Sequence, residues 1–239
     1  FEDSIDKTSI RIYDTTDKTN PASTRNVTVD GRYLDSRMIG DYVYAIINQP
    51  AIVTVYETNY QTSSEVVLPR ISINDKSTEV PPTEIYYSNV SDRFEAYTTV
   101  AAINVLDDAQ EPTIKSFLLG YTSTMYVSQS NIYVTFTGYS DTYYAQKTII
   151  HRIHIQDNII EGLASGQVPG YVLNQFSMDE NNGYFRIATT TGEVWMTTGE
   201  AMSQNHVYIL DSDLKTVGKL ENLAPGEKIY SARFMGNRA

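Results

Sequence analysis

The sequence predicts an all-β fold, a β-propeller of four-stranded antiparallel blades, with about four blades or part-blades in this chain. Two observations support this prediction. A hairpin pattern, in which two runs of β-forming residues flank a short polar turn, recurs along the chain. A second marker, an alternating apolar run that ends at an aspartate, recurs with nearly the same spacing. A period of about 50 residues in an all-β chain is typical of propeller blades.

The hairpin pattern is expected to form strands a and b of each blade, counted outward from the propeller axis. Its clearest copy is SRMIGDYVYAII at residues 36–47, where Gly40 and Asp41 supply the turn. Further copies lie at residues 125–136, 176–187 and 231–238. Counted at Asp41, Asn131, Gly183 and Asn237, the turns are 90, 52 and 54 residues apart.

The aspartate-ended run is expected to form strand c. Its copies end at Asp14, Asp107, Asp157 and Asp211, which are 93, 50 and 54 residues apart. Strand d should follow at residues 24–29, 113–119 and 215–220, and as an irregular stretch at residues 159–173. Both markers share one long interval, so the second blade is expanded by about 40 residues. The insertion lies at about residues 48–96, between strands b and c, within a single propeller domain that spans residues 1–239 and is a part of a longer protein.

Turn-forming residues join strands c and d. In the first unit, Asp14 and Asp17 lie in the sequence DTTDKTNP, whose Asp and Thr side chains can accept hydrogen bonds from backbone N–H groups. Asp211 and Asp213 form a similar turn in the last unit. Turn formation is the favoured interpretation, and calcium binding is the alternative, because neither sequence contains a complete calcium loop.

The insertion and the other b–c and d–a connections are expected on one face of the propeller. They carry many aromatic residues together with acidic ones. Tyrosine suits binding surfaces, since it combines apolar area with a polar tip. The candidate ligand-binding residues are Tyr86, Tyr87, Tyr139, Tyr143, Tyr144 and Trp195. Alternatively, these rings pack the insertion onto the blades.

Composition excludes several classes of function. The formal net charge of −11 and pI of about 4.7 argue against nucleic acid or an anionic lipid surface as a partner. The absence of cysteine excludes disulfides, thiol catalysis and cysteine-ligated metals. No apolar run approaches the roughly 18 residues of a membrane span, so this segment is not expected to insert into a membrane.

The sequence selects no catalytic residues. It contains no nucleophile elbow, P-loop or dinucleotide fingerprint. His151 and His154 are three residues apart on a predicted strand, so their side chains point to opposite faces and do not form a metal site. A hydrolase would need two suitably separated carboxylates, and nothing in the sequence selects such a pair.

Four stretches resemble a known family: VDGRYLDSRMIGDYVY at residues 29–44, PTEIYY at 82–87, GQVPGYVLNQFSMDE at 166–180 and GKLENLAPGEKIYSARFMG at 218–236. The family comprises secreted, mostly archaeal proteins with a C-terminal β-propeller domain distantly related to WD-type repeats. The resemblance implies export or attachment to the cell surface, and a longer parent protein. It implies no established activity and no functional residues, and the WD and kelch signatures themselves are absent.

These observations predict an extracellular or cell-surface binding or scaffold module without a resident cofactor. Its expected partners are proteins or carbohydrates at the cell surface. Copies of the chain are expected to associate through exposed blades unless the last a strand, at residues 229–234, joins the first c–d pair and closes a small ring. The alternative function is a hydrolase of cell-surface glycans or peptides that uses carboxylates on the insertion-bearing face.

Overall fold

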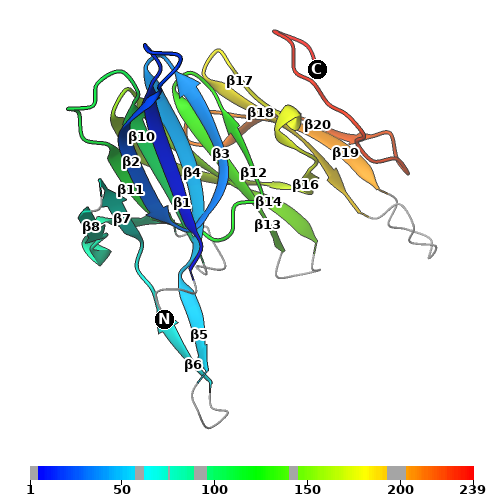
Figure 1. Ribbon diagram of the computed structural model, residues 1–239. Coiled ribbons are helices and arrows are strands. Elements are labelled where there is room, and N and C mark those ends of the chain that lie inside the picture. The colour runs from blue at the N-terminus through cyan, green and yellow to red at the C-terminus, as the bar shows by residue number, and fades with distance from the viewer. Residues whose placement is uncertain (1–4, 57–61, 75, 89–95, 140–144, 193–202) are drawn as a thin grey trace. The chain divides into compact units, whose positions relative to one another are not determined.

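The computed structural model describes residues 5–56, 62–74, 76–88, 96–139, 145–192 and 203–239 (Figure 1). The chain divides into two compact units. Unit 1 contains Phe1–Tyr121 and Gln156–Ile160, and unit 2 contains Thr122–Ile155 and Glu161–Ala239. Each unit consists mainly of antiparallel sheets, so the predicted all-β blade architecture is confirmed.

Unit 1 contains two larger sheets and a separate two-stranded ribbon. The first sheet has the strand order β1-β2-β7-β8, the second β3-β4-β10-β11-β9, and the ribbon β5-β6. The strands are β1 (Lys7–Asp14), β2 (Ala22–Asp30), β3 (Arg32–Ile39), β4 (Tyr42–Pro50), β5 (Ile52–Tyr56), β6 (Thr62–Val66), β7 (Arg70–Ile73), β8 (Lys76–Glu79), β9 (Ile85–Tyr87), β10 (Ala96–Asn104) and β11 (Thr113–Leu118), with the 3₁₀ turn η2 (Pro82–Glu84) before β9.

The hairpin expected at residues 36–47 is formed by β3 and β4. Its register brings Ile39 opposite Tyr42, which leaves Gly40 and Asp41 as the turn. Gly40 has a φ of +56°, a left-handed conformation that glycine adopts without steric cost. β10 and β11 then extend the sheet outward as strands c and d.

Residues between β4 and β10 extend both larger sheets of unit 1 at their outer strands. β7 pairs antiparallel with β2, and β8 pairs with β7. β9 pairs parallel with β11. Outer strands normally present unpaired backbone groups, so this segment covers two edges that would otherwise be open to other strands.

Unit 2 contains two sheets, with the strand orders β12-β13-β14-β15 and β16-β18-β19-β20, and β17 also pairs with β18. Its strands are β12 (Thr124–Val127), β13 (Asn131–Tyr139), β14 (Gln146–Gln156), β15 (Ile159–Pro169), β16 (Tyr171–Val172), β17 (Met178–Asn181), β18 (Tyr184–Thr191), β19 (Gln204–Leu210) and β20 (Thr216–Leu223), with the 3₁₀ turn η3 (Gln175–Ser177) before β17.

Two details of unit 2 differ from the sequence prediction. The stretch expected to be irregular after Asp157 forms β15, a strand of 11 residues in which Gly162 has a left-handed φ of +70°. The last hairpin copy forms only one bridge, between Met235 and Arg238 around a Gly236–Asn237 turn. A strand needs an ordered neighbour along its length, and β14 provides one for β15.

A hydrophobic core lies within each unit. In unit 1 it joins the first and second sheets and consists of Val27, Val29, Ala45, Ile47, Ala101 and Ile103. In unit 2 it joins the two sheets and consists of Tyr133, Ile150, Val168, Met178, Phe185, Ile187, Tyr208, Leu210 and Leu214. Alternating inward side chains from neighbouring strands produce this packing, as the apolar periodicity of the sequence indicates.

Candidate functional site

Tyr86, one of the sequence-predicted binding residues, lies beside a second aromatic ring and a cation. It lies in β9, opposite Phe117 of β11, and the two ring centroids are 5.3 Å apart. The Nζ atom of Lys115 lies 5.8 Å from the centre of the Tyr86 ring. The tyrosine remains 41% exposed. An exposed ring supported by a second aromatic residue and flanked by a cation can bind the apolar face of a sugar or a side chain of a protein.

The remaining candidates do not form one described cluster with Tyr86. Tyr87 is 72% exposed, but it follows Tyr86 directly in β9, so the two side chains point to opposite faces of the sheet. Tyr139 is exposed at the end of β13 in unit 2. Tyr143, Tyr144 and Trp195 lie outside the described residues.

The two aspartates of the first c–d turn bind their own backbone. Asp14 accepts a hydrogen bond from the backbone N–H of Thr16 at 2.8 Å. Asp17 accepts from both the N–H and the hydroxyl of Thr19, at 2.9 and 2.7 Å. The hydrogen bonds from Thr16 and Thr19 hold the pKa values of Asp14 and Asp17 below the ordinary aspartate value.

The last c–d turn follows the same pattern. Asp211 accepts hydrogen bonds from the backbone N–H groups of Asp213 and Lys215, both at 2.9 Å. Asp213 pairs with the Lys215 ammonium group at 3.5 Å. Across the described part of the chain, no group of three or more His, Cys, Asp or Glu side chains is placed to hold a metal ion. The contacts of these aspartates are those of turn formation.

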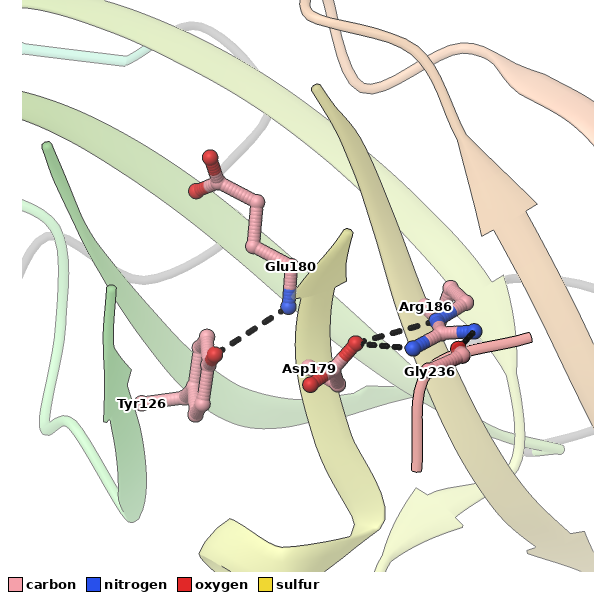
Figure 2. Close-up of polar contacts among 5 residues, drawn as sticks. All are labelled: Tyr126, Asp179, Glu180, Arg186 and Gly236. Carbon is pink, nitrogen blue, oxygen red and sulfur yellow. Dashed lines mark hydrogen bonds and ion pairs between the residues drawn. The ribbon is translucent and has the colours of Figure 1, made fainter. Parts of the chain in front are cut away.

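A polar cluster in unit 2 is centred on Glu180 of β17. The Glu180 Oε2 atom accepts hydrogen bonds from Ser128 Oγ at 2.7 Å, Asn131 Nδ2 at 3.0 Å and Tyr133 OH at 2.9 Å. The backbone N–H of Glu180 donates to the hydroxyl of Tyr126 at 3.2 Å, as Figure 2 shows. Burial and the Glu180 carboxylate both raise the pKa of Tyr133, so its phenol remains a donor. One carboxylate oxygen thus connects two successive inner hairpins.

Arg186 of β18 connects the inner hairpin β17–β18 to the C-terminal segment (Figure 2). Its Nε and Nη2 atoms both donate to Asp179 Oδ2, and its Nη1 atom donates to the Gly236 carbonyl at 2.7 Å. Its guanidinium carbon lies 5.0 Å from the centre of the Phe234 ring. The inner hairpin β17–β18 therefore contacts the next hairpin turn through a charged side chain.

Two of these contacts come from residues just before hairpin turns. Asn181 pairs with Tyr184 and Met235 pairs with Arg238 across two-residue turns, and Glu180 and Phe234 come one position before these pairs. Glu180 and Phe234 each contact the preceding hairpin. Sequence analysis located the turns but missed this network, because the residue at the contacting position changes from one repeat to the next.

The two buried histidines form hydrogen bonds with neighbouring hydroxyl groups. His151 is fully buried, with Nδ1 2.8 Å from Ser165 Oγ, and burial lowers its pKa to about 4. His206 accepts a hydrogen bond from the Asn222 N–H at Nδ1. The Nε2 atom therefore carries the proton and donates to Thr191 Oγ1 at 2.8 Å. In this arrangement His206 cannot accept a proton from the Thr191 hydroxyl, so the pair does not form an activated nucleophile.

The described residues also contain no helix with the length and apolar character of a membrane span. The contacts around Tyr86 leave its ring available to a ligand, whereas those of Glu180 and Arg186 are directed to neighbouring parts of unit 2.

Comparison with known proteins agrees with this architecture. An uncharacterised protein of Methanocaldococcus jannaschii, MJ1554, is 55% identical over 75 residues, which cover 31% of this chain and 12% of that protein. An uncharacterised protein of Archaeoglobus fulgidus is 23% identical over an alignment of 283 residues, covering 87% of this chain and 42% of that protein. The chain thus spans less than half the length of these two relatives. A model of the Beta propeller domain family matches residues 2–239, and the chain belongs to this family.

Proposed function

We propose that this chain is an extracellular or cell-surface binding module that recognises carbohydrate or protein through the Tyr86 ring. The observation that carries the proposal is the exposed Tyr86 ring, supported by Phe117 and flanked by Lys115. The ring offers a flat apolar surface, and Lys115 adds a hydrogen-bond donor and positive charge beside it. Sugars and acidic or aromatic protein segments offer the complementary groups.

The extracellular location rests on the resemblance of four sequence stretches to exported archaeal proteins. Surface labelling of intact cells with a membrane-impermeant reagent would test the location. Labelling only after cell lysis would contradict it.

A binding screen against glycan and protein arrays would test the site. We expect the Tyr86→Ala variant to lose about 2- to 12-fold in affinity, the range that corresponds to one aromatic contact. Tyr13→Ala is a matched control, because Tyr13 is 48% exposed and lies in β1 of the same unit. Thermal unfolding of both variants would separate a lost contact from a lost fold. Equal affinity of wild type and Tyr86→Ala for every ligand found would exclude this site.

The hydrolase alternative receives less support from the described residues. Asp179 and Glu180 lie beside an inner hairpin turn, on the face expected to be opposite the insertion, and are bound by Arg186 and by three uncharged donors, respectively. They therefore do not supply the carboxylate pair that this alternative requires. Release of reducing sugars or peptides from cell-wall material by the purified protein would reverse this preference.

A further inference from the structure

The β5–β6 ribbon is a sheet of its own within unit 1. Five residue pairs join its strands, from Ile52–Val66 at the base to Tyr56–Thr62, and no third strand pairs with either among the described residues. In Figure 1 the ribbon extends away from the larger sheets of unit 1. Ile52 and Val66 face each other across the ribbon and are 48% and 72% exposed. An isolated two-stranded ribbon is only marginally stable in water, so a further strand would stabilise it.

At the outer edge of β5, backbone groups at defined positions pair with no other described residue. The Val67 N–H donates to the Ala51 carbonyl at 3.0 Å at the base of the ribbon. In an antiparallel pair, residues alternate between those directed at the partner strand and those directed away from it. The backbone N–H and C=O groups of Val53 are therefore directed toward β6, whereas those of Ile52 and Thr54 are directed to the open edge.

Thr54 is the middle residue of β5, so antiparallel pairing of two β5 strands about this residue would place Thr54 opposite Thr54 of the second strand. Thr–Thr pairs are favourable cross-strand combinations. Thr54 would also exchange its outward N–H and C=O groups with Thr54 of the second strand. We propose that β5 pairs antiparallel with β5 of a second copy of this chain, which converts two ribbons into one four-stranded sheet.

Charge supports a second copy at this edge. Two chains of net charge −11 repel each other, so a contact between copies requires a surface without like charges. Residues 42–56 contain no Asp, Glu, Lys or Arg. A contact of five residue pairs is smaller than a standard stable interface, so we expect a weak dimer that forms at high protein concentration. The two-fold relation makes the contact closed, which limits assembly to dimers.

Substitution of Thr54 by charged residues tests the proposal, because Thr54 would face Thr54 of the second copy across the two-fold axis. We expect sedimentation analysis of the wild-type chain to show a concentration-dependent dimer. The dissociation constant of the dimer should be at least tenfold higher for Thr54→Lys and for Thr54→Glu, because two like charges would face each other. An equimolar mixture of the two variants should recover association as a heterodimer.

Ser64→Lys provides the matched control. Ser64 pairs with Thr54 inside the ribbon but lies on β6, away from the proposed contact. The Ser64→Lys substitution adds the same charge as Thr54→Lys. We expect this variant to dimerise like the wild type, and circular dichroism to show unchanged strand content in all variants. A wild-type chain that stays monomeric at the highest soluble concentration would overturn the proposal. It would also fail if the Lys and Glu variants dimerise separately as well as they do when mixed.

Discussion

Arg25 of β2 donates a hydrogen bond from Nη2 to the backbone carbonyl of Asp108, 83 residues later in the chain. The same nitrogen donates to the Asp107 carbonyl at 3.2 Å. Arg25 is only 3% exposed, and its Nη1 atom has no hydrogen-bond partner among the residues that the structure describes. The first sheet of unit 1 is thus tied to the c–d turn of the second sheet by a buried charge.

Replacement of Arg25 by methionine should destabilise the protein by about 2–4 kcal/mol, because the two carbonyls lose a charged donor and part of the buried stem is lost. Denaturant unfolding followed by circular dichroism would measure the change in the free energy of unfolding. Arg32→Met is the control, since the ion pair of Arg32 with Asp6 is highly exposed and should contribute less than about 1 kcal/mol. Equal effects of the two substitutions would show that the Asp108 contact contributes nothing.

Glu180→Gln should destabilise unit 2 by about 1–3 kcal/mol. A neutral amide oxygen is a weaker acceptor than a carboxylate, and its NH₂ group adds donors to a site that already contains three. Tyr133→Phe removes one of those donors, so the two substitutions should couple in a double-mutant cycle by at least about 0.5 kcal/mol. Strictly additive effects on the free energy of unfolding would contradict a stabilising hydrogen bond between Glu180 and Tyr133.

Local patterns in the sequence were sufficient to predict the inner hairpins and strand c. Alternating apolar residues and turns such as Gly40–Asp41 act over a few residues, and the structure has hairpins at these places. The position of β15 was harder to predict, because Gly162, Ser165 and Gly166 reduce its β-propensity. A Cβ atom at Gly166 would lie 2.4 Å from the Leu214 carbonyl oxygen. The need for glycine at this position thus arises from a contact almost 50 residues away.

Contacts between distant segments account for the other features that the sequence did not predict. β7 and β9 pair with β2 and β11, and nothing in their own short sequences identifies these partners. Likewise, Glu180 is recognisable as a residue beside a turn, but its donors come from the preceding hairpin. The placement of Tyr86 beside Lys115 likewise depends on the parallel pairing of β9 with β11, and its role in binding stays a prediction.

Stability should fall as the pH drops from about 6.5 to about 4, because of His151. Burial lowers the pKa of the folded imidazole to about 4, while the unfolded imidazole binds a proton near pH 6.5. The unfolded state thus takes up more protons in this window, and each pH unit can remove up to about 1.4 kcal/mol. Unfolding free energies measured across the window should show a smaller slope for His151→Leu. Ile187→Val, a core change without a titrating group, should lower stability at every pH and leave the slope unchanged.

Alanine at Gly170 should destabilise the protein far more than alanine at Gly40. Both glycines have positive φ, +86° and +56°, so each substitution carries a backbone cost of about 1–2 kcal/mol. At Gly40 nothing lies within 4 Å of the new Cβ atom, whereas at Gly170 it would lie 2.4 Å from the Thr190 carbonyl oxygen. Relief of that overlap must move β16 away from β18, which adds about 1–3 kcal/mol. Denaturant unfolding of both variants gives the comparison, and Gly40→Asn, which tolerates positive φ, should be milder than either. Equal losses in the free energy of unfolding for the two alanine variants would mean that backbone conformation alone sets the loss. The close approach of Gly170 to Thr190 would then contribute nothing.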